Sequence, residues 1–221
     1  MRKKIRPVWL WLLFLTLFLG LIFQSFPVKA QEQEELRLYS QSVVLMDGLS
    51  GRILYGKNAE QIRPMASTTK IMTCILALEN SGLDTEVEIS DRAASMPEVK
   101  LHAGKGEKYR LEDLLYSLML ESHNDSAVAV AEHIGGSVEE FAEKMNRKAW
   151  EIGCKNVCFV TPNGLDVADA DGNEHSASAA DMARIMRYCA FQSPCRETFL
   201  EITRTASRTI QDESGNRSFY L

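Results

Sequence analysis

The chain has 221 residues, of which 45% are apolar, a length and composition that suit one domain with a sizeable core. It carries 25 basic and 30 acidic residues, a formal charge of -5. The first 30 residues hold five basic and no acidic side chains, so the rest has 20 basic against 30 acidic residues, or -10. This acidic balance argues against a nucleic-acid partner and against electrostatic binding to anionic lipid.

The first 30 residues have the pattern of a secretory signal peptide. A basic segment at residues 2–6 precedes the apolar run at residues 8–23, and Val28-Lys29-Ala30 supplies small residues at the spacing of a cleavage site. Cleavage there would leave residues 31–41 as a polar linker. The alternative is an uncleaved anchor with membrane association, because the apolar run approaches the length of a membrane span. Both interpretations predict an exported, extracytoplasmic protein of the cell envelope.

Hydrophobic periodicity predicts the elements of the remaining chain. A β-hairpin is expected at residues 42–55, where two β-rich runs flank a glycine-bracketed turn. A helix that is apolar on nearly every face, and therefore buried all round, is expected from Ser67 to about Asn80. Further helices are expected at residues 111–119, 125–134, 137–152 and 177–190, with a strand after Glu201. This order predicts an α+β domain whose first hairpin joins a late sheet across a helical subdomain.

A serine and a lysine stand three residues apart at the start of the buried helix, in "PMASTTKIMT". On a helix this spacing puts Ser67 and Lys70 on the same face, one turn apart. A buried ammonium must find a partner or shift its pKa toward the neutral amine, and a neutral lysine beside a serine is a general base beside a nucleophile. The alternative is that Ser67 only caps the helix and Lys70 extends its stem to water.

A second pair of polar residues, Ser122 and Asn124, lies between two predicted helices in "LESHNDSA". In an extended or turn segment, residues two apart can face the same cleft. A hydroxyl can pass a proton, and an amide can both donate to and accept from a peptide bond. The alternative is that both are loop and cap residues.

Metal and cofactor chemistry is not predicted. The segment from Asp169 has Glu174 where a calcium loop needs glycine, and no pair of histidines has the spacing of a helical zinc motif. His175 is expected to anchor its loop. The five cysteines are an odd number for an exported protein, with Cys74 in the core and one disulfide open among the others, whose pairing cannot be assigned from sequence: Cys154, Cys158, Cys189 and Cys195.

Three blocks occur in this order: "VVLMDGLSGRILYGKNAEQIRPMASTTKIMT", "LLYSLMLESHNDSAVAVAEHIGG" and "FVTPNGLDVADADGNEHSASAADMARI". Together they closely resemble the serine D-alanyl-D-alanine carboxypeptidases, the low-molecular-mass penicillin-binding proteins, from about residue 42 to the end. The resemblance implies a catalytic domain over residues 42–221. Its fold would be that of the serine β-lactamases and penicillin-binding proteins, an antiparallel sheet with a helical subdomain.

Two features depart from the family pattern. His123 occupies the middle of the S-x-N motif, where many relatives have a small residue. The third family motif, lysine, then threonine or serine, then glycine, does not occur, because the only lysine after Trp150 is Lys155, which precedes Asn156. We therefore expect an incomplete chain that lacks C-terminal strands and is poorly active alone, with the motif within about thirty residues of Leu221 in an extended reading frame.

The resemblance implies a role for each candidate residue. Ser67 would attack the carbonyl of the penultimate D-alanine, Lys70 would accept its proton, and Ser122 would relay that proton to the leaving amine. Asn124 would bind the substrate's peptide group, and the Ser67 backbone N–H would be one oxyanion donor. The implied partners are peptidoglycan stem peptides as substrate and β-lactam antibiotics as inhibitors, without a cofactor or metal.

Two other functions remain open on the sequence alone. A β-lactamase-like hydrolase would use the same acylation chemistry with fast deacylation, although the loop of the third block follows the carboxypeptidase pattern. A catalytically impaired penicillin-binding or cell-wall-docking module would fit the absent third motif. Turnover of a D-Ala-D-Ala peptide by the complete gene product distinguishes a catalyst from a binder.

Overall fold

The computed structural model describes Trp11 and residues 37–221. The predicted signal peptide, its cleavage site and most of the predicted linker therefore lie outside the described residues, apart from Trp11. Contacts divide the chain into two units between Tyr39 and Ser40, and the second unit, residues 40–221, contains both predicted motifs. In the described part of the chain, no helix combines the length and the apolar character that crossing a bilayer requires.

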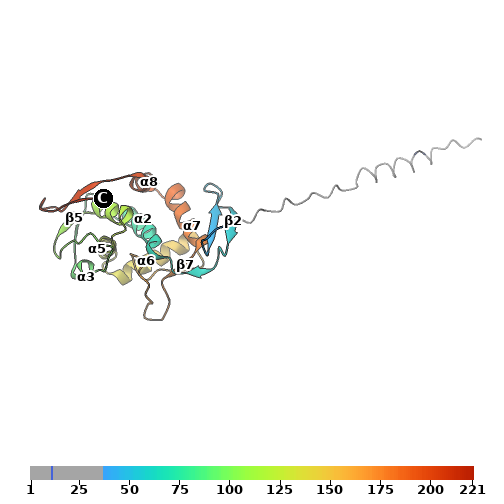
Figure 1. Ribbon diagram of the computed structural model, residues 1–221, viewed down its shortest axis with the longest axis horizontal. Helices are drawn as coiled ribbons and strands as arrows, with labels where there is room; N and C mark the ends of the chain where they lie inside the picture. The colour runs from blue at the N-terminus through green and yellow to red at the C-terminus, as the bar shows by residue number, and fades with distance from the viewer. Residues whose placement is uncertain (1–10, 12–36) are drawn as a thin grey trace, which may run out of the picture. The chain divides into compact units, whose positions relative to one another are not determined.

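The second unit alternates short strands with helices (Figure 1). Its strands are β1 (Val43–Met46), β2 (Ile53–Lys57), β3 (Ile62–Arg63), β4 (Glu86–Glu88), β5 (Lys108–Arg110), β6 (Val157–Cys158), β7 (Ser176–Ser178), β8 (Thr209–Gln211) and β9 (Ser218–Tyr220). Its helices are the 3₁₀ helix η1 (Ala66–Thr69), α2 (Lys70–Asn80), α3 (Asp91–Ala94), α4 (Leu111–Leu120), α5 (Asn124–Gly135), α6 (Val138–Ile152), α7 (Ala179–Arg187), the π-helix η2 (Tyr188–Gln192) and α8 (Arg196–Arg204).

Helix α2 runs through the middle of this unit, as its apolar sequence predicts. It packs against α4, α5, α6, α7 and α8, and Figure 1 shows it enclosed by helices. Met72, Cys74, Ile75 and Ala77 are fully buried. The predicted helix from Ser67 to about Asn80 is confirmed in extent, but its first turn is the separate 3₁₀ segment η1.

The strands form four small antiparallel sheets, of orders β1-β2, β3-β7-β6, β4-β5 and β8-β9. The hairpin at residues 42–55 is confirmed as β1 and β2. Within the described residues, β1 and β2 pair only with each other and β8 pairs with β9, so the expectation that the hairpin joins a late sheet stays a prediction. The Glu213 N–H donates to the carbonyl of Lys108, the first residue of β5, and Arg208 forms ion pairs with Glu112 and Asp113 of α4. These contacts hold β8–β9 near β5, at the end of the unit opposite β2 (Figure 1).

Two predictions about the C-terminal third were wrong in detail. The helix expected at residues 177–190 begins only at Ala179, because residues 176–178 form β7 between β3 and β6. The Ser178 side chain then caps α7 by accepting from the Asp181 N–H. The strand expected directly after Glu201 begins only at Thr209. Helix α8 instead continues to Arg204, because its apolar face buries Phe199 and Ile202 in the core.

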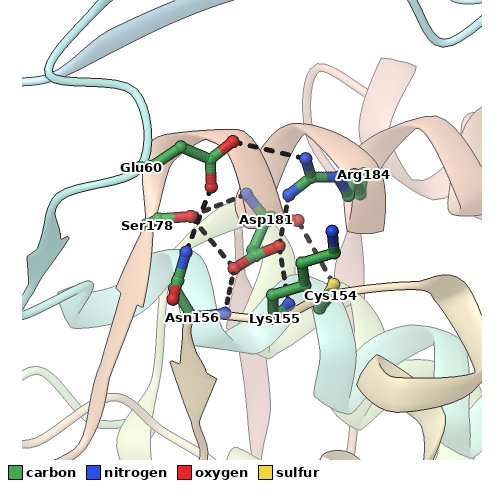
Figure 2. A network of polar contacts seen from close by, with 7 residues as sticks. All are labelled: Glu60, Cys154, Lys155, Asn156, Ser178, Asp181 and Arg184. Carbon is green, nitrogen blue, oxygen red and sulfur yellow. Dashed lines mark hydrogen bonds and ion pairs between the residues drawn. The ribbon is translucent and has the colours of Figure 1, made fainter.

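A buried carboxylate fixes the position of β7. Asp181 is fully buried and accepts hydrogen bonds from the Asn156 N–H at 2.6 Å, the Ser178 hydroxyl at 3.0 Å and Arg184 at 2.5 Å. Figure 2 shows these groups converging on it, with Glu60 bridging Asn156 and Arg184 from outside. The network ties the turn before β6 to the start of α7, and β7 between them pairs with β3, which leads directly into η1.

Candidate active site

Ser67 and Lys70 meet at the junction between η1 and α2. Ser67 lies in the middle of η1 and is exposed, whereas Lys70 is the first residue of α2 and is only 2% exposed. The Lys70 Nζ lies 3.3 Å from the Ser67 Oγ. The predicted contact between the two side chains is therefore present, and the alternative in which Lys70 extends to water is wrong.

The Lys70 amine is surrounded by neutral acceptors. Its Nζ lies 2.9 Å from the Asn124 Oδ1 and 2.8 Å from the Asn163 carbonyl oxygen. Among the described residues, no carboxylate forms an ion pair with it. Burial without a counter-charge lowers the pKa of Lys70 from its ordinary value near 10.5 to about 8.

Asn124 is held firmly at the first turn of α5. Its backbone N–H donates to the Val99 carbonyl at 2.8 Å, and its side-chain Nδ2 donates to the Pro97 carbonyl at 3.2 Å. The neighbouring Asp125 carboxylate, fully buried, accepts from the Leu101 and Ala103 N–H groups and thereby fixes the same loop. Because Pro97 occupies the amide nitrogen, the Asn124 Oδ1 must face Lys70. Both ends of the amide, which we expected to hold substrate, are thus used within the protein.

Ser122 differs from the other predicted site residues. It is half-buried and has a positive φ of 62°. Within the described chain, its hydroxyl makes no hydrogen bond to protein. The next residue, His123, turns its Nδ1 to the Ser117 hydroxyl at 2.8 Å, and Ser117 is in turn hydrogen-bonded to Ser126 at 2.7 Å. The structure therefore brings Ser67, Lys70 and Asn124 into direct contact and places Ser122 on the adjoining loop.

Asn163 was not predicted from the sequence to hydrogen-bond with Lys70. It acts through its backbone carbonyl, which no side-chain pattern reveals, although its loop belongs to the third sequence block. The loop is attached to α2 by a hydrogen bond of 2.6 Å from the Thr73 hydroxyl to the Pro162 carbonyl. Gly164 then packs directly on η1: a Cβ at this position would lie 1.9 Å from the Ala66 carbonyl oxygen.

These contacts define what Lys70 can do. A neutral amine has two N–H donors and one lone pair. If Asn124 and Asn163 accept from the two donors, the lone pair faces the third neighbour, the Ser67 hydroxyl. Lys70 is then placed to remove the proton of Ser67, which makes the hydroxyl a nucleophile.

Comparison with known proteins assigns the chain to a family. The family model described as D-alanyl-D-alanine carboxypeptidase matches residues 28–218. The D-alanyl-D-alanine carboxypeptidase DacF of Bacillus subtilis is 37% identical over 179 residues, which are 76% of this chain and 45% of that protein.

Solved structures agree with this match. The D-alanyl-D-alanine carboxypeptidase DacD from Francisella tularensis superposes with a TM-score of 0.74 at 28% identity, over 83% of this chain and 44% of that one. Penicillin binding protein 5 from Haemophilus influenzae gives 0.68 at 34% identity, over 77% and 49%. The present chain thus spans about half the length of these relatives. The predicted α+β fold of the penicillin-binding proteins is confirmed, and the chain belongs to the D-alanyl-D-alanine carboxypeptidase family.

Proposed function

We propose that the protein is a serine-type D-Ala-D-Ala carboxypeptidase that removes the terminal D-alanine from peptidoglycan stem peptides through an acyl-enzyme on Ser67. The observation that carries this proposal is the buried Lys70, which has only neutral hydrogen-bond partners and lies 3.3 Å from the Ser67 hydroxyl. Such a lysine serves poorly as a structural ion-pair partner. It suits a general base beside a nucleophile.

In the proposed reaction the Ser67 Oγ attacks the carbonyl carbon of the penultimate D-alanine while Lys70 takes the hydroxyl proton. The tetrahedral oxyanion is stabilised by the Ser67 backbone N–H at the start of η1, because the first N–H groups of a helix have no partner within the helix. The C–N bond then breaks, a proton reaches the departing amine through Ser122, and free D-alanine leaves. Water hydrolyses the ester and regenerates Ser67. A β-lactam would acylate the same serine.

The experiment follows the acylation of Ser67 in two ways, using the protein that contains this chain. Incubation with a peptide ending in D-Ala-D-Ala should release D-alanine, and incubation with benzylpenicillin should add one drug mass to the tryptic peptide that contains Ser67. Ser67→Ala should abolish both signals, whereas Ser207→Ala, at an exposed serine, should leave both unchanged. An adduct on another residue, or D-alanine release that persists in Ser67→Ala, would refute the assignment.

We also propose that the protein is exported to the cell envelope, because peptidoglycan is assembled outside the cytoplasm. The support is the sequence pattern of residues 1–30, a basic segment followed by an apolar run and small residues at 28 and 30. N-terminal sequencing of the secreted protein should begin at Gln31. Recovery of Met1 on membrane-bound material would instead favour the uncleaved anchor.

A further inference from the structure

We propose that His175 is a positioning residue which, through the Thr69 hydroxyl and the Ala66 carbonyl, sets the direction of the Ser67 backbone N–H. The inference rests on the proposed function, in which that N–H stabilises the oxyanion. The starting observation is a buried histidine, only 2% exposed, whose two ring nitrogens are both hydrogen-bonded and which has no part in the proton transfers of Ser67 and Lys70.

The protonation state of the ring depends on its partners. The His175 Nδ1 accepts from the backbone N–H groups of Val160 at 3.0 Å and Thr161 at 3.2 Å. Since a backbone N–H can only donate, Nδ1 carries no proton, and in the neutral ring the proton is on Nε2. Burial also lowers the pKa of His175 to about 4, although the nearby Asp166 acts in the opposite direction. His175 is therefore a fixed donor on its Nε2 side.

The Nε2 side of His175 is connected by hydrogen bonds to the residue before Ser67. The His175 Nε2 lies 2.7 Å from the Thr69 Oγ1, which it can only approach as a donor. The Thr69 hydroxyl then directs its own proton to the Ala66 carbonyl oxygen, also at 2.7 Å. Without the His175 donor, the Thr69 oxygen would be free to accept from another group and to turn its proton away from the Ala66 carbonyl. With it, the hydroxyl has one orientation.

The geometry of the peptide bond transmits this orientation to Ser67. The Ala66 carbonyl and the Ser67 N–H belong to one planar trans peptide and point in opposite directions, so fixing the oxygen fixes the N–H. Ala66 has a positive φ of 46°, a conformation that costs a non-glycine residue about 1 kcal/mol or more and therefore needs support. The contact of Gly164 with the same carbonyl oxygen supplies a second restraint.

Thr68 provides an internal control for this arrangement. Its hydroxyl makes the same local bond three residues back, to the Met65 carbonyl at 2.6 Å. Unlike Thr69 it is exposed, and among the described residues no histidine is hydrogen-bonded to it. The Met65 carbonyl also does not share a peptide plane with the Ser67 N–H. A general weakening of η1 should therefore result from losing either hydroxyl, whereas loss of the proposed positioning should result only from losing that of Thr69.

Two substitutions of His175 distinguish the roles of its two ring nitrogens. In His175→Asn the side-chain oxygen can replace Nδ1 as the acceptor for the loop, but the donor to Thr69 is lost. In His175→Gln the amide nitrogen can replace Nε2 as the donor to Thr69, but the acceptor for Val160 and Thr161 is lost. Thr69→Val removes the hydroxyl from the other side, and Thr68→Val is its matched control.

The measurement is acylation by benzylpenicillin, resolved into the dissociation constant and the acylation rate constant, together with thermal unfolding of each variant. Removing a whole oxyanion donor costs about 10²–10³ in rate, so misdirecting one should cost about 10- to 100-fold. We expect this loss in the acylation rate constant, at an unchanged dissociation constant, for His175→Asn and for Thr69→Val. The double variant should be no slower than the slower single variant. His175→Gln and Thr68→Val should stay within about threefold of the parent.

Several outcomes would overturn the inference. One is normal acylation by His175→Asn, and another is a loss in His175→Gln as large as that in His175→Asn, since this would show that only loop anchoring matters. Nitrogen chemical shifts of the His175 ring provide a readout that does not depend on activity: a proton on Nδ1 in the parent protein would also refute the relay. Failure of the parent protein to react with benzylpenicillin would instead refute the proposed function on which the inference rests.

Discussion

At the scale of the residue, the charge state of Lys70 should control the rate. Its amine must be neutral to accept the Ser67 proton, and burial lowers its pKa to about 8. As the pH falls below this value the amine becomes protonated, so the acylation rate constant should drop about tenfold per pH unit and level off above it. The pH dependence of benzylpenicillin acylation between pH 6 and 10 measures this directly.

Lys70→Arg is the matched variant for that profile. A guanidinium keeps the positive charge but does not lose its proton in the working range, so acylation should fall by at least about 100-fold and the rise near pH 8 should vanish. A rate close to that of the parent, with the same dependence on pH, would show that Lys70 is not the general base.

His175 should couple the stability of the fold to pH. Its pKa is about 4 in the folded state and 6.5 ordinarily, so between these values the unfolded chain binds the proton and the folded chain does not. The contribution is fully present above pH 6.5 and is lost as the pH falls toward 4, by about 3 kcal/mol in the free energy of unfolding.

The measurement compares urea unfolding at pH 7 and pH 4.5 for the parent and for His175→Asn. Asp166, which acts on the ring electrostatically, and Glu174, the preceding residue in the same pocket, are present in both proteins, so the comparison isolates the effect of the His175 ring. The parent should lose more stability than the variant over this range. Equal losses would mean that the ring is already protonated in the folded protein or is not buried in solution.

At the scale of the element, Asp181 should carry much of the stability of the β3-β7-β6 sheet. Asp181→Ala would leave the Asn156 N–H, the Ser178 hydroxyl and the partly exposed Arg184 without their shared acceptor. We expect a loss of about 3 kcal/mol in the free energy of unfolding, measured by urea titration. Glu143→Ala, at an exposed carboxylate on α6, should change it by less than about 0.5 kcal/mol. Similar losses in both variants would show that the network is not stabilising.

Elements with a local cause were predictable from sequence. Helix α6 begins after Ser137, whose side chain accepts from the Glu140 N–H, and ends at Gly153, which adopts the left-handed conformation. Both signals lie within one turn of the helix ends. The three residues of β7, by contrast, are held as a strand by β3 and β6, which are distant in sequence. A run of small residues of that length is equally compatible with the first turn of a helix, which is why it was mispredicted.

The candidate site divides in the same way. The contact between Ser67 and Lys70 depends on spacing within one segment, and its prediction is confirmed. The resemblance placed Asn124 in the same site as Lys70 but as a substrate-binding residue, and its hydrogen bond to Lys70, 54 positions away in sequence, was not predicted. The Asn163 carbonyl and the conformation of Ala66 were not predicted at all, since backbone groups leave no signature in residue type.

At the scale of the whole molecule, the folded unit shares one core in which α2 is the common element. Helices from both the middle and the end of the chain pack on it, and the buried apolar side chains from Met65 to Leu221 form one cluster. Lys70 sits at the start of this helix, so the site and the core cannot be separated. Loss of packing anywhere along α2 should therefore lower the free energy of unfolding of the entire unit.

Ile75→Ala tests this coupling. Ile75 is fully buried in α2, and its truncation should cost about 2–5 kcal/mol in the free energy of unfolding. Burial raises the pKa of Cys74, so its thiol stays protonated and unreactive in the folded protein. Because the core is shared, far-ultraviolet circular dichroism and alkylation of Cys74 should give the same urea midpoint. That midpoint should be lower in the variant than in the parent. Ile53→Ala, at a position 39% exposed on β2, should lower the stability by less than about 1 kcal/mol. If Cys74 instead became reactive at a lower urea concentration than the one at which the circular dichroism signal is lost, α2 would open separately. The core would then not unfold as a single cooperative unit.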